Sequence, residues 1–139
     1  MKLLIIEDNP DDVAAVERLA DQSPVPVEVI AHTDGRDALD WMKGADGLPD
    51  LVLLDLNLPG LSGSDILRRI KSHTRLRDVP VIVVSGSEYD EDILEGLRLG
   101  AHSHIVKPIS RGDFAWIAAS VRKVQPRLLA LRGVEERGC

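Results

Sequence analysis

Five short apolar runs alternate with stretches whose apolar residues recur at helical spacing, and this alternation leaves few possible folds. The runs cover residues 3–6, 27–30, 51–54, 81–84 and 102–106. Alternating strands and helices joined by short connections favour right-handed crossovers and one parallel sheet. The run 51–54 is apolar at every position, which is typical of a strand that helices cover on both faces. The pattern therefore predicts a doubly wound α/β domain with three layers.

Helices are predicted between these runs by capping residues and by apolar spacing. Asn9 can cap a helix that starts with Pro10 and continues to about residue 20. Four more helices are expected: one that follows Thr33-Asp34-Gly35 and is stopped by Gly44, and three over about 64–72, 90–98 and 113–124. Because Pro126 breaks the last helix, the chain divides into a domain over residues 1–124 and a C-terminal extension over 125–139, which we expect to be partly helical or mobile.

Composition excludes several classes of function. The formal net charge is −6, from 23 acidic and 17 basic residues, which disfavours direct binding to nucleic acid. The single cysteine is Cys139, so no disulfide framework or cysteine-based metal site is expected. No apolar run approaches the roughly 20 residues needed to cross a bilayer, and the residues before the first strand are too few for a signal peptide. We therefore expect a cytoplasmic protein without membrane partners.

Charged or hydroxyl-bearing residues follow four of the five predicted strands. Glu7 and Asp8 follow the first strand, Asp55 the third, Ser85 the fourth and Lys107 the fifth. The carboxyl ends of parallel strands meet in one crevice, so these side chains should lie together. Three carboxylates in one place repel one another unless a cation sits among them, and Mg²⁺ is the cation that such hard oxygen ligands suit.

The same set suits a phosphoryl group. Lys107 supplies a positive charge and Ser85 a hydroxyl donor, and phosphoryl transfer depends mainly on charge neutralisation and positioning. An aspartate such as Asp55 can itself be the nucleophile and hold the group as an aspartyl-phosphate. Taken singly, each residue has an ordinary explanation as a turn, cap or surface residue, but their joint arrangement is far more specific.

Four motifs around these positions are typical of one protein family. They are Ile6-Glu7-Asp8-Asn9, Leu54-Asp55 with Pro59 and Gly63, Val84-Ser85-Gly86, and Gly100-Ala101 followed by Lys107-Pro108. Ser85 and Lys107 follow Asp55 by 30 and 52 positions. Over residues 2–124 the chain resembles the receiver domain of bacterial two-component response regulators. The resemblance implies a flavodoxin-like fold whose strands are ordered 2-1-3-4-5.

The resemblance also implies a role for each carboxylate. Asp55 would be the phosphoacceptor, supplied by a phosphohistidine on a sensor histidine kinase or on a phosphotransfer protein. Mg²⁺ would be held by Glu7, Asp8, Asp55 and the backbone carbonyl of Asn57.

Further roles fall on the residues that surround the phosphoryl group. By resemblance, the Ser85 hydroxyl and the Lys107 ammonium would contact phosphoryl oxygens, and the peptide bond from Lys107 to Pro108 would be cis. Asn57 and Ser87 match positions that tune the rate of autodephosphorylation.

Position 104 departs from the family pattern. The family usually has Tyr or Phe three positions before the lysine, as a switch that turns inward when the Ser/Thr, here Ser85, moves towards the phosphoryl group. This chain has His104 there. Either His104 acts as a weakened switch whose state depends on pH, or it is a half-exposed strand residue without a switching role.

Trp116 is a second residue with two interpretations. It follows the core-facing Phe114 by two residues, which turns it about 200° away on a helix, towards solvent. It is either an ordinary exposed apolar residue or an anchor for a homodimer formed through the last helix. The segments 55–60 and 72–78 also look like stand-alone receivers paired with phytochrome-type kinases, which tend to be dimeric.

These observations favour a single-domain response regulator that switches partner binding or relays a phosphoryl group. It would be no enzyme beyond its own phosphorylation and slow dephosphorylation. Phosphohydrolases of the haloacid-dehalogenase type need a second Asp two positions after the nucleophile, where this chain has Asn57. The alternative is a degenerate receiver that binds partners independently of phosphorylation, although the intact set of site residues argues against it.

Overall fold

The computed structural model describes residues 1–44, 48–87 and 91–124, and these form a five-stranded parallel sheet flanked by helices. The strands are β1 (Lys2–Ile6), β2 (Glu28–His32), β3 (Leu51–Asp55), β4 (Val81–Ser85) and β5 (Ser103–Val106). The helices are α1 (Pro10–Asp21), α2 (Gly35–Lys43), α3 (Gly63–Ser72), α4 (Glu91–Arg98) and α5 (Arg111–Val124). The sheet order β2-β1-β3-β4-β5 confirms the predicted doubly wound fold.

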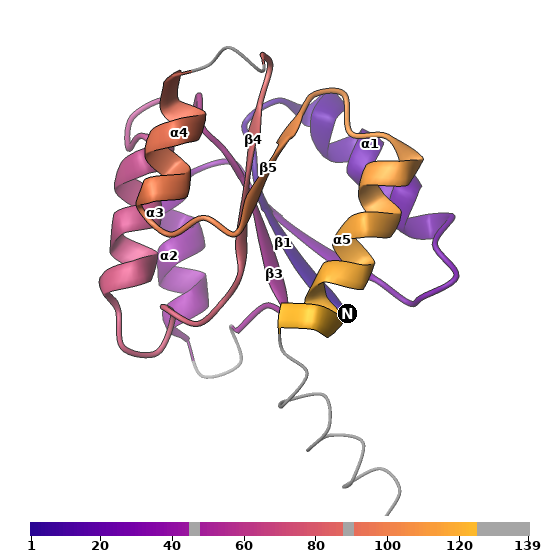
Figure 1. Cartoon of the computed structure of the whole chain (residues 1–139), viewed down its shortest axis with the longest axis horizontal. Coiled ribbons are helices and arrows are strands. Elements are labelled where there is room, and N and C mark those ends of the chain that lie inside the picture. The colour runs from indigo at the N-terminus through magenta and orange to yellow at the C-terminus, as the bar shows by residue number, and fades with distance from the viewer. Residues whose placement is uncertain (45–47, 88–90, 125–139) are drawn as a thin grey trace, which may run out of the picture.

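The sheet separates two helical layers (Figure 1). Helices α1 and α5 cover one face, while α2, α3 and α4 cover the other. Successive side chains of a strand point to opposite faces, so Leu53 of β3 packs in the core beneath α1 and α5, and Leu54 packs in the other core. All four residues from 51 to 54 have no exposed surface, as predicted for a strand covered on both faces.

Strands β2, β3 and β4 end slightly later than the apolar runs suggest. Asp55 and Ser85 are the last residues of β3 and β4, and each pairs with a residue of the next strand. Asp55 therefore pairs with Val84, and Ser85 pairs with Val106. Both polar side chains are consequently held by the rigid sheet and not by a loop.

Helix ends follow the capping signals in the sequence. Asn9 Oδ1 accepts a hydrogen bond from the backbone amide of Asp11 at 2.9 Å, and Pro10 begins α1 as predicted. Helix α5 begins at Arg111, two residues before the predicted position. The reason is a pair of reciprocal bonds, in which the amide of Ser110 donates to Asp113 and the amide of Asp113 donates to Ser110 Oγ.

Two further expectations concern membrane-spanning helices and the C-terminal extension. None of the helices in the described part of the chain is long and apolar enough to span a membrane. The predicted extension over 125–139 lies outside the described residues.

Candidate functional site

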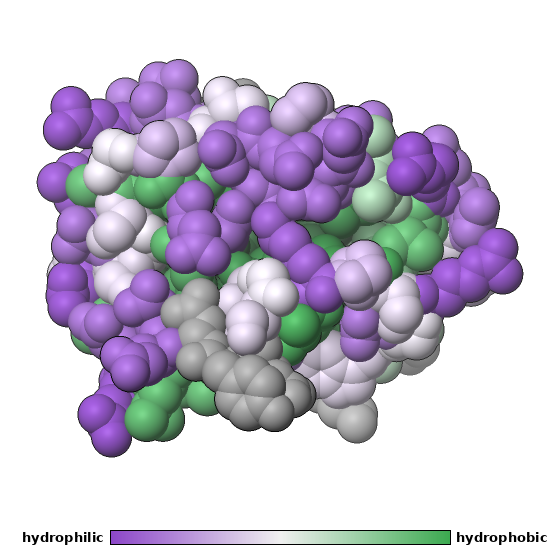
Figure 2. Space-filling model, turned by 90° about the horizontal axis from the view of Figure 1, so that it is seen from above, coloured by the Kyte–Doolittle hydropathy of each residue, from purple (hydrophilic) through white to green (hydrophobic). Residues whose placement is uncertain are grey.

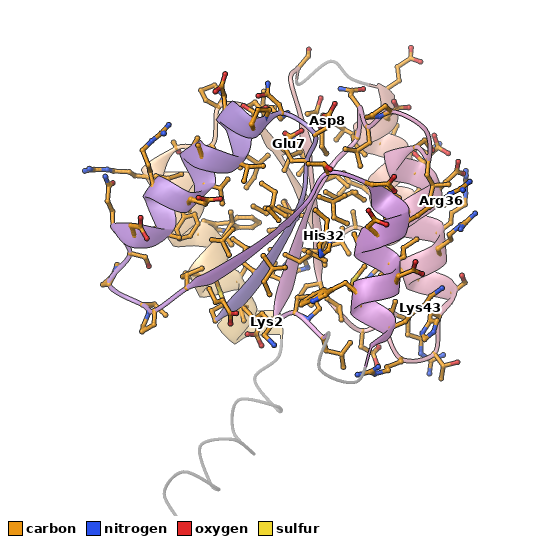
Figure 3. All side chains as sticks on the ribbon, turned by 180° about the vertical axis from the view of Figure 1, so that it is seen from behind. Lys2, Glu7, Asp8, His32, Arg36 and Lys43 are labelled. Carbon is orange, nitrogen blue, oxygen red and sulfur yellow. The ribbon has the colours of Figure 1, made fainter. Side chains whose placement is uncertain are left out.

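Three carboxylates meet at the carboxyl ends of β1 and β3. Glu7 and Asp8 follow β1 directly, and Asp55 ends β3. One carboxylate oxygen from each residue lies within 4.8 Å of the others. Figure 3 shows Glu7 and Asp8 at this end of β1, with Lys2 at the opposite end. The structure therefore brings together the three side chains that the sequence assigns to a metal.

The three carboxylates differ in their access to water. Glu7 and Asp55 are only 2% and 5% exposed, whereas Asp8 is exposed. The backbone amide of Glu7 donates to the carbonyl of His32 at 3.0 Å, so Glu7 extends the pairing of β1 with β2 and is held beside the sheet. The end of the molecule that carries the carboxyl ends of the strands has a mostly hydrophilic surface (Figure 2). A ligand can therefore approach the cluster from the side of Asp8.

Lys107 reaches this cluster from the loop after β5. Its ammonium pairs with Glu7, lies 2.8 Å from Asp12 Oδ2 and lies 3.4 Å from Asp55 Oδ2. The backbone amide of Lys107 donates to the carbonyl of Ser85 at 2.7 Å, which anchors the lysine to β4. The peptide bond between Lys107 and Pro108 is cis, as the family resemblance implies.

Asp12 is a site residue that sequence reasoning missed. It lies in the first turn of α1, where an acidic residue is the ordinary complement to a helix dipole. The signal that could have found it is topological, because α1 follows β1 at once and its first turn must lie above the crevice.

Glu7 and Asp55 influence each other's ionisation. Burial, together with a hydrogen bond to the neighbouring Asp55 carboxylate, raises the pKa of Glu7 from 4.5 to about 8. Burial alone would also raise the pKa of Asp55, but the hydrogen bond from Glu7, the amide of Asn57 at 2.9 Å and the charge of Lys107 hold it below its usual value. Near neutral pH, therefore, Asp55 is ionised while Glu7 carries a proton unless a cation replaces it.

Lys107 remains charged within this site. Burial alone would lower its pKa, but hydrogen bonds to Asp12 and Glu7 and the charge of Asp55 raise the pKa of Lys107 above its ordinary value. The site thus combines a buried anion at Asp55 with a permanent cation beside it, an arrangement suited to an anionic ligand carried on Asp55.

The remaining predicted residues lie around the cluster at different depths. Ser85 is fully buried, and its hydroxyl donates to the carbonyl of Ser87 at 3.0 Å. Asn57 and Ser87 are exposed at the rim. Because the Ser85 hydroxyl already donates to the loop after β4, the Ser85 side chain must rotate before it can donate to a ligand.

His104 and Trp116 lie away from the carboxylates. His104 is exposed on β5, an edge strand, and pairs in register with Val83 of β4. Trp116 is 41% exposed on α5, which confirms the predicted outward direction. The structure therefore does not bring either residue into the cluster.

Comparison with known proteins agrees with this geometry. A family model described as the response regulator receiver domain matches residues 3–118. The probable methanogenesis regulatory protein FilR2 of Methanothrix harundinacea is 33% identical over 115 residues, which is 80% of this chain and 74% of that protein. Three curated relatives are matched over 34%, 58% and 74% of their own length, so this chain spans only part of each.

Two solved structures show the same arrangement of elements. The phosphorylated cyanobacterial phytochrome response regulator RcpA is 32% identical, with a TM-score of 0.73 over 88% of this chain and 91% of that chain. The Mn²⁺-bound form of the response regulator Rcp1 is 27% identical, with a TM-score of 0.69 over 90% of this chain and 89% of that chain.

Proposed function

The chain belongs to the response regulator receiver domains of two-component systems, and from this premise we propose that Asp55 accepts a phosphoryl group. The observation that carries the proposal is a buried, ionised carboxylate at the end of β3, with the Lys107 ammonium 3.4 Å away. The donor is a phosphohistidine on a sensor histidine kinase or a phosphotransfer protein. RcpA, whose structure is of the phosphorylated protein, is a relative with the same fold.

The transfer makes one bond and breaks another. A lone pair on an Asp55 carboxylate oxygen attacks phosphorus, and the P–N bond to the donor histidine breaks. Its electron pair returns to the imidazole nitrogen, which takes up a proton from solvent. The product is an acyl phosphate on Asp55, and the Lys107 ammonium offsets the charge of its oxygens.

The chemistry of the donor set fits Mg²⁺. Glu7, Asp8 and Asp55 place oxygens within 4.8 Å of one another, as hard oxygen ligands of Mg²⁺ require. Burial and the neighbouring Asp55 carboxylate raise the pKa of Glu7, and a bound cation would favour its ionised form. We infer that these carboxylates hold the ion together with the backbone carbonyl of Asn57. When bound, the ion supplies positive charge that neutralises the phosphoryl oxygens. Rcp1, which was crystallised with Mn²⁺, supports a divalent cation.

Phosphorylation then changes the loops around the site. The Ser85 hydroxyl leaves the carbonyl of Ser87 and donates to a phosphoryl oxygen, which shifts the loop after β4. Asn57 and Ser87, exposed at the rim, tune the access of water and thus the phosphoryl lifetime. His104, on the edge strand β5, acts as a weakened switch that turns inward when Ser85 moves. The phosphorylated protein then binds a partner through its altered surface, or passes the phosphoryl group on to another protein.

The organisation of the chain completes the proposal. Residues 1–124 form the receiver and the remainder is an extension, with homodimers assembling through the face of α5 that carries Trp116. The net charge of −6 argues that the partner is a protein and not nucleic acid. We place the protein in the cytoplasm, together with its phosphodonor.

Intact mass spectrometry after incubation with Mg²⁺ and acetyl phosphate tests the proposal. We expect one phosphate adduct on the wild-type protein and none on Asp55→Asn. Asp11→Asn is the matched control, since it removes an exposed carboxylate next to the site and should leave the adduct intact. If the wild-type protein forms no adduct with this or any other donor, the phosphorylation-independent binding module is the correct interpretation.

A further inference from the structure

Lys107 has a carboxylate partner outside the group formed by Glu7, Asp8 and Asp55. Asp12 Oδ2 lies 2.8 Å from the Lys107 ammonium, closer than Asp55 Oδ2 at 3.4 Å. The two residues are 95 positions apart in sequence, so this pair joins the first turn of α1 to the loop after β5. Both side chains are partly buried, with 24% of the lysine and 35% of the aspartate exposed. The contact is therefore a partly desolvated ion pair between two separate elements.

The other two carboxylate partners of Lys107 bind other groups during phosphorylation. Glu7 and Asp55 belong to the group of carboxylates that can hold a cation, and Asp55 also takes the phosphoryl group. A divalent cation among them repels a neighbouring ammonium. Asp12 lies outside that group and keeps its negative charge available to the lysine.

From this arrangement, and resting on the proposed function, we propose that Asp12 is a positioning residue for phosphorylation, acting through Lys107. It holds the ammonium beside Asp55 while the metal and the phosphoryl group occupy the other carboxylates. Without the Asp12 carboxylate, the ammonium is either repelled towards solvent or competes with the cation for Glu7. In both cases it is misplaced when the charge on the phosphoryl oxygens must be offset.

A simpler explanation for Asp12 is a general effect of an acidic residue at a helix start. Asp11 separates the two explanations, because it carries the same charge in the same turn of α1. In the described structure the carboxylates paired with Lys107 are those of Glu7, Asp12 and Asp55. Asp11→Asn therefore removes the helix effect alone, whereas Asp12→Asn removes the helix effect and the ion pair.

The first measurement is the rate of phosphorylation by acetyl phosphate at saturating Mg²⁺. We expect Asp12→Asn to slow it about fivefold, as for the loss of one partly exposed charge pair, and Asp11→Asn to leave it unchanged. Asp12→Glu should restore much of the rate. In a Lys107→Met background, Asp12→Asn should cause no further loss, because the group through which Asp12 acts is gone.

The second measurement needs neither metal nor phosphodonor. The side-chain NMR resonances of Lys107, identified by their loss in Lys107→Met, should shift in metal-free Asp12→Asn and stay in place in Asp11→Asn. If the Lys107 resonances do not shift in Asp12→Asn, the ion pair between Asp12 and Lys107 is refuted, whatever the phosphorylation rates are.

Equal rates for Asp11→Asn and Asp12→Asn, or an undiminished effect of Asp12→Asn without Lys107, would overturn the positioning role alone. If Asp12→Asn shifts the Lys107 resonances but the wild-type protein never forms an adduct, the proposed function fails, and the positioning role fails with it.

Discussion

The buried carboxyl group of Glu7 should make folding stability depend on pH, and Glu7→Gln tests the reasoning. Burial and the neighbouring Asp55 raise the pKa of Glu7 from 4.5 to about 8. A carboxyl with a higher pKa in the folded than in the unfolded state contributes its full stabilisation below pH 4.5 and loses it as the pH rises through about 8. Metal-free wild-type protein should therefore lose stability between about pH 6 and about pH 9.

The linkage relation gives the size of this loss. For one carboxyl whose pKa is 4.5 unfolded and about 8 folded, the free energy of unfolding falls by roughly 2–3 kcal/mol between about pH 6 and about pH 9. Glu7 is 2% exposed, so solvent screening reduces this figure little. Gln at this position keeps a hydrogen-bond donor for Asp55 but cannot ionise, so this contribution to the pH dependence disappears.

Urea denaturation of both proteins in the presence of EDTA, at several pH values across this range, measures the effect. The comparison isolates position 7, because the histidines and all other titrating groups are common to both proteins. We expect Glu7→Gln to gain stability relative to wild type as the pH rises. A difference between the two proteins that stays constant with pH would refute a protonated Glu7 in the metal-free site.

Further predictions concern the metal, the loop after Asp55 and the surface of α5. Because Mg²⁺ needs ionised Glu7, its apparent affinity should rise with pH and level off above about 8; calorimetry that finds no pH dependence below this value would contradict the assignment. Gly63→Ala should lower the free energy of unfolding by about 1–3 kcal/mol, measured by urea denaturation, because a Cβ there would lie 2.7 Å from Leu56 Cα and 2.9 Å from the Asp55 carbonyl oxygen. Trp116→Ala should weaken dimers in light scattering yet leave the unfolding midpoint of the monomer nearly unchanged, since the indole is 41% exposed. If light scattering finds the wild-type protein to be monomeric, the predicted dimer interface on α5 is refuted.

Much of the fold could be predicted because its signals are local. The apolar runs locate every strand to within two residues, and capping residues such as Asn9 locate the helix starts. The start of α5 was predicted two residues too far along the chain, but a local signal for the correct start exists, since Ser110 and Asp113 form a recognisable capping box. The same alternation predicted a doubly wound parallel sheet, because short connections between parallel strands allow few paths. The strand order 2-1-3-4-5 was implied by the resemblance to receiver domains.

The sequence by itself also determined which chemistry the site could hold. Carboxylates, a hydroxyl and an ammonium stand at strand ends, and in a parallel sheet those ends share one edge. Strand ends and parallel topology therefore suffice to bring Glu7, Asp8, Asp55 and Lys107 to one place, without any distance.

Only the tertiary structure decided how these groups share charge. Burial and the neighbouring Asp55 raise the pKa of Glu7, whereas the hydrogen bond from Glu7, the Asn57 amide and Lys107 hold the pKa of Asp55 below its usual value. The pairing of Asp12 with Lys107 spans 95 positions and depends on how α1 packs against the sheet. Residue spacing reports which groups meet at an edge, but desolvation and contact distances arise from packing between elements, and no local pattern encodes them.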